Sequence, residues 1–227
     1  MAMTAAGLTG CENASVRKKQ AAEALEQKYH EKFEVTDYRN AGFMADYYTV
    51  QAYADEYPDL LFEASVDIKS GNVMDSYVTK RLCDRLSDKI SQNLGVLEND
   101  YFVFTEAMLG DTLLTDPMVS LEDYMKDGPN KFTIYLCMNQ ENANIQNIAA
   151  ALGKMLDGIT GIRGSIAFYL MDSELMQNVQ EYVTSHDDTY GDFDEMVEDA
   201  YIGSTEFENG SFYLAEDALR EMAGGRL

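Results

Sequence analysis

Apolar and polar residues alternate along several stretches of the chain with the two-residue period of a half-buried β-strand. The clearest stretch is 60–69, where Phe62, Ala64, Val66 and Ile68 alternate with polar or charged residues. Similar or strongly apolar stretches predict further strands at 34–38, 45–54, 100–107, 131–138, 162–171, 199–206 and 210–215. Short turns separate the first three strands, so we expect these to form an antiparallel meander.

Apolar residues spaced three or four positions apart predict the helices. In the range 15–32 the apolar stripe consists of Ala21, Leu25, Tyr29 and Phe33. In the range 74–93 it consists of Met74, Val78, Leu82, Leu86 and Ile90. Further helices are expected from residue 120, and over 141–157, 173–185 and 216–223. The order of elements predicts an α+β fold, as a single domain with a mixed, largely antiparallel sheet and helices packed on one or both of its faces.

Two glycine signals mark turns between these elements. Asn209-Gly210 is typical of a tight hairpin turn. Gly161 and Gly164 lie at the start of a predicted strand, and this pair of glycines indicates a tight turn and not a phosphate-binding loop.

The charge of the chain restricts its partners. Among its 227 residues, 40 are acidic and 17 are basic, which gives a formal net charge of −23. Nucleic acids and anionic membrane surfaces are bound through clusters of Lys and Arg, so we expect neither as a partner. A cationic or protein partner would be attracted from a distance. The alternative is that the charge serves only to keep the protein soluble.

The start of the chain carries a short motif. Residues 1–10 are small or apolar and uncharged, and Leu8-Thr9-Gly10-Cys11 stands where a polar stretch begins. This motif resembles the lipobox of bacterial lipoproteins, in which a signal peptidase cuts before the cysteine and the sulfur receives a lipid. We interpret 1–10 as the end of a signal peptide whose basic beginning is missing from this sequence. The alternative is an ordinary N-terminus with a chance cysteine.

The resemblance implies an arrangement of the whole chain. It makes residues 11–15 a tether and residues 16–227 a single α+β domain outside the cell, attached to the membrane through the lipid on Cys11 only. No other stretch approaches the ~18 apolar residues that span a bilayer. The segments 28–35, 57–64 and 75–78 are similar to small lipoproteins of Gram-positive bacteria that lack an assigned function. That second resemblance implies a location and a fold, and no active site.

Residues with catalytic or redox chemistry are few. His30 and His186 are the only histidines, and neither has the spacing of a metal site or the sequence context of a catalytic triad. Cys83 lies on a predicted helix and Cys137 on a predicted strand. They either pair in an oxidising exterior or remain buried free thiols.

The best candidate site in the sequence is an acidic run around Gly191. Its proposed binding residues are Asp187, Asp188, Asp192, Asp194 and Glu195. Clustered carboxylates suit Ca²⁺, although this spacing does not match an EF-hand loop, and they also suit Lys or Arg of a protein partner. The alternative is a solvated acidic loop. No other cofactor is expected. A second candidate is a set of aromatic residues that either bind a partner or pack within a strand: Tyr47, Tyr48, Tyr53 and Tyr57.

These features predict an extracytoplasmic lipoprotein that binds a partner, with a protein as the favoured class, and performs no catalysis. An immunity protein that neutralises a basic secreted toxin is the first alternative. A cell-wall hydrolase that uses paired carboxylates is the second, because any two of the 40 acidic residues could lie at the required separation.

Overall fold

The structure is a computed structural model. It describes residues 9–40, 45–95, 101–107, 114–126, 131–141, 152–185 and 192–212, together with the single positions 149, 218 and 221. The chain forms two compact units, of which the first contains residues 1–78 and 111–117 and the second contains residues 79–110 and 118–227.

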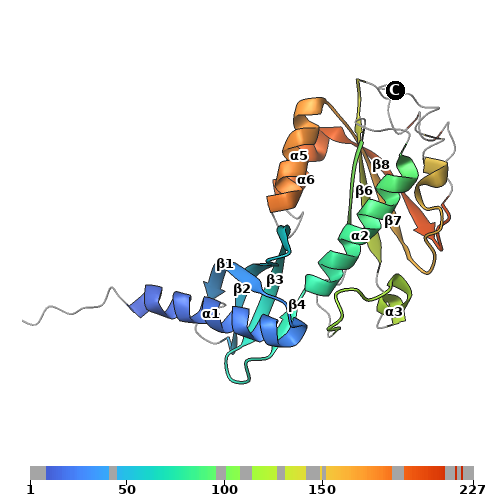
Figure 1. The fold of residues 1–227 in the computed structure, drawn as a ribbon. Coiled ribbons are helices and arrows are strands. Elements are labelled where there is room, and N and C mark those ends of the chain that lie inside the picture. The colour runs from blue at the N-terminus through green and yellow to red at the C-terminus, as the bar shows by residue number, and fades with distance from the viewer. Residues whose placement is uncertain are drawn as a thin grey trace, which may run out of the picture. The chain divides into compact units, whose positions relative to one another are not determined.

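The first unit is an antiparallel sheet with one helix packed on it (Figure 1). The helix α1 covers Thr9–Tyr29, and the strands are β1 Phe33–Asn40, β2 Tyr47–Ala54, β3 Tyr57–Asp67 and β4 Val73–Asp75. Their order in the sheet is β1-β2-β3-β4, with every neighbouring pair antiparallel. The predicted three-strand meander is therefore confirmed, and a fourth strand extends it.

The core of this unit follows the two sequence periods. The stripe of α1 buries Ala21, Leu25 and Tyr29 against the sheet face that carries Phe62. Phe33, the first residue of β1, continues the stripe, and its ring lies 5.8 Å from the ring of Phe62. The helix ends at Tyr29 because the next residue adopts the left-handed conformation, with a φ of 60°.

The second unit contains a mixed sheet. Its strands are β5 Tyr101–Ala107, β6 Phe132–Asn139, β7 Arg163–Met171 and β8 Tyr201–Glu208, in the order β5-β6-β7-β8. The pair β6 and β7 is parallel, and the other two pairs are antiparallel. The helices are α2 Tyr77–Leu94, whose first two residues belong to the first unit, α3 Leu121–Lys126, α5 Ser173–Ser185 and α6 Asp192–Val197, followed by a 3₁₀ turn Glu198–Ala200.

Helices cover both faces of this mixed sheet. On one face, Phe104, Cys137 and Tyr169 form a core with Val179 of α5 and Phe193 of α6. On the other face lies α2 (Figure 1), which is tied to β5 where Thr105 Oγ1 donates a hydrogen bond of 2.7 Å to the Cys83 carbonyl. The predicted α+β class, with mixed strand pairing and helices on both faces, is confirmed.

Several elements differ from the prediction. The strands form two four-stranded sheets and not one, because the chain leaves β4 through α2 and starts a new sheet at β5. The helix expected over 15–32 begins at Thr9 and ends at Tyr29, so residues 11–15 are helical. Most of the strand expected at 210–215 and of the helix expected at 216–223 lies outside the described residues.

Candidate functional site

The turn between β3 and β4 shapes the site. Gly71 has a φ of 74°, a conformation that residues with a side chain rarely adopt. The Asp67 carboxylate accepts hydrogen bonds from the backbone N–H groups of Lys69 and Ser70 at 3.0 and 2.6 Å, and from the Ser70 hydroxyl at 2.8 Å. These hydrogen bonds, those from Ser70 above all, hold the pKa of Asp67 below its usual value, so the carboxylate stays charged and closes the turn.

Strand β4 ends the sheet of the first unit. Its residues pair with β3 as Val66 with Val73, Ser65 with Met74 and Ala64 with Asp75. No described strand pairs with the opposite side of β4. In an antiparallel ladder, the backbone groups of alternate residues point toward the partner strand and away from it. Hydrogen bonds from Asp67 N to Asn72 O and from Ser76 N to Glu63 O fix this alternation, so the N–H and C=O of Val73 point away from β3.

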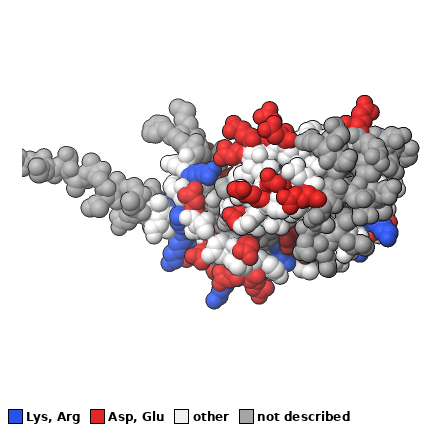
Figure 2. Space-filling view, turned by 90° about the horizontal axis from the view of Figure 1, so that it is seen from above, with Lys and Arg blue, Asp and Glu red and all other residues white. Residues whose placement is uncertain are grey.

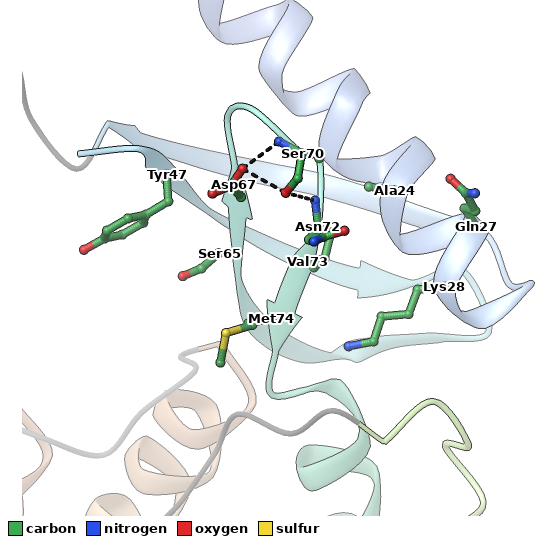
Figure 3. A pocket seen from close by; sticks show the side chains of 11 residues that line it. Ala24, Gln27, Lys28, Tyr47, Ser65, Asp67, Ser70, Asn72, Val73 and Met74 are labelled. Atoms are coloured by element: carbon green, nitrogen blue, oxygen red, sulfur yellow. Dashed lines mark hydrogen bonds between the residues drawn. The ribbon is translucent and has the colours of Figure 1, made fainter. Parts of the chain in front are cut away.

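A groove of about 940 Å³ follows this open edge, and we call it the β4 groove (Figure 3). Its lining residues come from α1, β2, β3 and the β3–β4 hairpin: Ala24, Gln27, Lys28, Tyr47, Ser65, Asp67, Ser70, Gly71, Asn72, Val73 and Met74. Two large side chains of this lining are unusually exposed, Tyr47 at 48% and Met74 at 50%. The groove therefore combines polar groups with solvent-exposed apolar surface.

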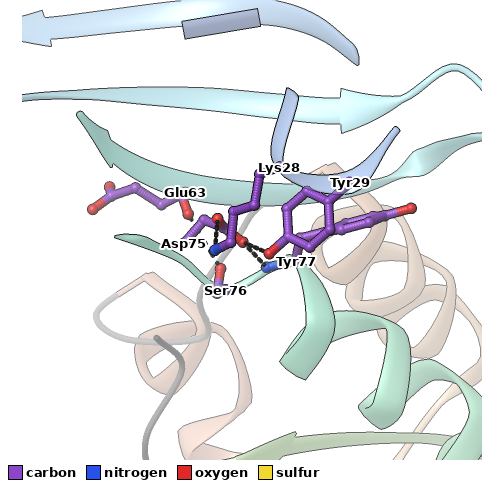
Figure 4. A network of polar contacts seen from close by, with 6 residues as sticks. All are labelled: Lys28, Tyr29, Glu63, Asp75, Ser76 and Tyr77. Carbon is purple, nitrogen blue, oxygen red and sulfur yellow. Dashed lines mark hydrogen bonds and ion pairs between the residues drawn. The ribbon is translucent and has the colours of Figure 1, made fainter. Parts of the chain in front are cut away.

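A buried polar network fixes one wall of the β4 groove (Figure 4). The Asp75 carboxylate is fully buried and accepts three hydrogen bonds: from Lys28 Nζ at 2.7 Å, from the Tyr29 hydroxyl at 2.6 Å and from the backbone N–H of Tyr77 at 3.0 Å. Burial raises the pKa of Tyr29 far above its ordinary value, and the Asp75 carboxylate raises it further. The tyrosine thus stays protonated and donates to Asp75.

Because of this network and of the hairpin turn, the described lining of the β4 groove carries no charge without a partner inside the protein. Lys28 and Asp67 are the two charged residues of its lining, and each is engaged, Lys28 by Asp75 and Asp67 by the hairpin turn. The remaining polar lining consists of amide and hydroxyl groups, as in Gln27, Ser65 and Asn72. Such a surface offers hydrogen bonds and apolar contact to a ligand, and it contains neither histidine nor cysteine.

The acidic run of the sequence is only partly described. Asp187 and Asp188 lie outside the described residues, whereas Asp192, Asp194 and Glu195 lie exposed on α6. The run is helical because Phe193 and Val197, four residues apart, are buried in the core of the second unit. In the part of the chain that the structure describes, no group of three His, Cys, Asp or Glu residues could hold a metal ion.

Apart from Tyr47, the described cysteines and tyrosines of the sequence prediction do not line the β4 groove. Cys11 falls within α1, and its side chain lies outside the described residues. Cys83 and Cys137 are free and buried, which confirms the second of the two alternatives for them. Burial raises the pKa of Cys83 to about 12, so this thiol is unreactive at neutral pH. Tyr48 is buried on the sheet face opposite to that of Tyr47, so the tyrosines do not form one surface.

The β4 groove was not among the predictions from the sequence. Met74 was expected in the apolar stripe of the helix over 74–93, but it lies in β4 and is half exposed. The reason is that α2 starts three residues later, at Tyr77. Ser70-Gly71-Asn72 was a usable signal, because a tight turn after a strand predicts that a second strand returns beside it.

Comparisons with known proteins describe the fold alone. No known protein family matches the chain, and no curated protein matches it either. The chain is similar in structure to a crystal structure of a DUF5037 family protein from Ruminococcus gnavus, with a TM-score of 0.71 and 11% sequence identity. The similarity covers 92% of this chain and 99% of the other. In the described part of the chain, no helix combines the length and the apolar character needed to cross a bilayer.

Proposed function

We propose that this protein is an extracytoplasmic lipoprotein, anchored through a lipid on Cys11, that binds an extended segment of a partner protein in the β4 groove and performs no catalysis. The observation that carries this proposal is the open edge of β4 within a groove that has contact surfaces on both sides. The lipobox-like motif at Leu8-Thr9-Gly10-Cys11 supports the location.

The geometry favours an extended peptide. An unpaired strand edge presents backbone N–H and C=O groups in a row, and a peptide in the β conformation pairs with them. Successive side chains of such a peptide would point to opposite faces of the sheet. On one face they would meet Gln27 and Lys28 of α1, and on the other they would meet Met74, with Tyr47 farther along the same wall of the groove. Tyr and Met are enriched in protein interfaces, which agrees with this occupant.

Electrostatics adds a preference for the partner as a whole. The lining of the groove is close to neutral, so the bound segment itself needs no particular charge. The chain, however, carries a net charge of −23. A basic partner is therefore attracted from a distance and associates faster at low salt. The exposed acidic residues of α6 also favour a basic partner. A basic secreted toxin is such a partner, so an immunity function is the second candidate.

Site-specific photo-crosslinking in the native host tests the groove. A photoreactive amino acid at Tyr47 should yield a discrete adduct with one protein, identified by mass spectrometry. The matched control is the same probe at Tyr201, a tyrosine of similar exposure in the second unit, 45% against 48%. Identical adducts at both positions, or none at Tyr47, would contradict the proposal. An adduct with a basic secreted toxin would select the immunity candidate.

A second variant pair tests the strand edge itself. Val73→Pro removes a backbone N–H that points away from β3, so it spares the ladder and blocks an added strand. It should abolish the Tyr47 adduct, whereas Val73→Ala should retain it. Circular dichroism checks that both variants fold.

The anchor is tested separately. Mass spectrometry of protein from its own host should find a lipid on Cys11, and the Cys11→Ala variant should leave the membrane fraction. A Cys11→Ala variant that stays with membranes would contradict the anchor and leave the groove proposal intact.

A further inference from the structure

A second pocket, of about 390 Å³, lies in the second unit beside α2. It is lined by one face of α2, by residues 118–122 and by residues 158–160. Its volume falls within the range of about 300–1,000 Å³ that is usual for small-molecule sites. We call it the α2 pocket. It shares no residue with the β4 groove, so an occupant of one does not depend on the other.

The floor of the α2 pocket is apolar. Leu82 and Leu86 come from α2, Val119 precedes α3, and Ile159 precedes β7, and all four are buried. Met118 stands at the lip with 62% of its surface exposed. A flexible thioether in that position adapts to the shape of an apolar ligand. The floor and lip therefore suit a hydrocarbon body and offer it little hydrogen bonding.

Two cations converge on this apolar surface from successive turns of α2. Arg85 donates a hydrogen bond of 2.7 Å from Nη2 to the Val119 carbonyl, and its Nη1 lies 3.4 Å from Met118 Sδ. These contacts hold the guanidinium at the pocket wall. Lys89 is exposed and makes no ion pair with any residue in the described part of the chain. Positions four apart on a helix lie on one face, so both charges point to the same side.

Basic residues outnumber acidic ones in the lining of the α2 pocket, whereas acidic residues outnumber basic ones in the whole chain. Its lining holds Arg85 and Lys89 against one acidic residue, Glu122, whereas the whole chain has 17 basic and 40 acidic residues. A cationic rim over an apolar floor is complementary to an amphipathic anion. Hydrogen bonds between a carboxylate and Lys or Arg are the stronger, charge-assisted kind.

We propose that the α2 pocket binds a small carboxylate with an apolar body, the carboxylate lying against Lys89 and Arg85 and the body against the apolar floor. The straight-chain fatty acids from hexanoate to dodecanoate represent this chemistry. The corresponding primary alcohols have the same body without the charge.

Isothermal titration calorimetry on the full chain with these probes tests the proposal. At least one carboxylate of the series should bind saturably with one site per chain, and its alcohol should bind at least about tenfold more weakly, because it lacks the charge-assisted hydrogen bond. Lys89→Gln should weaken the carboxylate about tenfold. Lys154→Gln, which removes another exposed lysine of the same unit outside the pocket lining, should change the affinity less than about twofold.

A further variant separates the pocket from unspecific hydrocarbon binding. Thr160 is exposed and lines the pocket, so Thr160→Trp should fold, fill the space and abolish binding. The proposal is overturned if no carboxylate of the series binds saturably. It is equally overturned if Lys89→Gln and Lys154→Gln have the same effect, or if Thr160→Trp binds as well as the unchanged protein.

Discussion

Asp75 is the centre of the buried polar network of the first unit. Its carboxylate is fully buried, and its ion pair with Lys28 is largely shielded from solvent, since the lysine side chain is only 14% exposed. Removing one partner of a buried pair leaves the other charge without compensation in a medium of low dielectric constant. The cost of such a change is therefore much larger than the net value of the pair.

Asp75→Asn should lower the free energy of unfolding by about 3–4 kcal/mol, because it leaves the Lys28 ammonium buried beside a neutral amide. Urea denaturation at neutral pH measures this loss. The control is Asp46→Asn, which breaks the exposed Lys69–Asp46 pair, whose side chains are 74% and 68% exposed. That variant should show no measurable loss. Equal effects would show that the burial of Asp75 does not matter.

Tyr29 should make stability fall in alkaline solution. Its pKa is raised in the folded protein, while in the unfolded chain it titrates near its ordinary value of 10.0. Above pH 10 the folded state thus binds more protons than the unfolded state, so the free energy of unfolding decreases as pH rises. Tyr29→Phe should reduce that slope by up to ~1.4 kcal/mol per pH unit.

Urea denaturation of both proteins between pH 9 and pH 11 provides the measurement. At pH 7 the variant should lose only the contribution of its hydrogen bond, as a constant offset. Curves that remain parallel through pH 10 and 11 would contradict the role assigned to Tyr29.

At the scale of elements, the parallel pair β6 and β7 depends on a close backbone approach. Gly164 pairs with Phe132, and a Cβ at Gly164 would lie 1.7 Å from the Phe132 carbonyl oxygen. No real side chain fits at that distance without moving one strand. The glycine interpreted as part of a turn is therefore the point where two central strands meet.

Gly164→Ala should lower the free energy of unfolding by about 3 kcal/mol, because β7 must shift relative to β6. Gly153→Ala is the matched control: a Cβ at this position, within the helical residues 152–155, meets nothing within 4 Å. Alanine there should raise the free energy of unfolding by up to ~1 kcal/mol through its higher helix propensity. Thermal unfolding measures the stability of both variants. A change in melting temperature of the same sign in both would contradict this account.

The elements with strong local signals were predictable from the sequence. Helix α5 covers Ser173–Ser185, the predicted range, because Asp172 caps it by accepting a hydrogen bond of 2.8 Å from the Leu175 N–H. Strand β3 covers most of its predicted range, and Phe62, Ala64 and Val66 are buried in alternation as predicted, but the strand begins at Tyr57 and ends at Asp67, so Ile68 lies outside it and is exposed. In both cases the periodicity, the cap or the turn acts within a few residues.

The elements that were missed depend on distant contacts. β4 has only three residues, too few for a periodic signal, and it exists through its pairing with β3. No helix was predicted for α6, because Phe193 and Val197, the two apolar residues that bury it, stand among carboxylates that were interpreted as a candidate binding site or, alternatively, as a solvated loop. The β4 groove depends on such distant contacts too, since it is formed by the β3–β4 pairing and by the packing of α1. The hydrogen bond between Tyr29 and Asp75, which fixes its wall, joins residues 46 positions apart.

At the scale of the whole molecule, charge is the dominant property. On the face that Figure 2 shows, Asp and Glu side chains form several groups among uncharged residues, and Lys and Arg are fewer. A net charge of −23 makes the folded chain repel itself. Stability should therefore depend on the ionic strength of the solvent.

The melting temperature at pH 7 should rise by several degrees when NaCl is increased from 10 to 200 mM, because the screening length falls from ~30 Å to below ~10 Å. Differential scanning calorimetry measures this rise. At pH 5, closer to the isoelectric point of about 4.2, the same increase in salt should have a smaller effect. A melting temperature that does not respond to salt at pH 7 would show that self-repulsion is negligible.

Under the proposed anchor, the continuity of α1 would set how far the protein reaches from the membrane. If Cys11 carries a lipid, no flexible linker separates it from the fold, since α1 runs from Thr9 to Tyr29 without a break. At 1.5 Å per residue, the 17 residues between Cys11 and Lys28 amount to about 25 Å of rigid rod. A helix that stands upright would hold its far end, and any captured peptide, about one bilayer core thickness above the lipid headgroups. Partners embedded flush with the bilayer would then be out of range, while those that project from it would be within range.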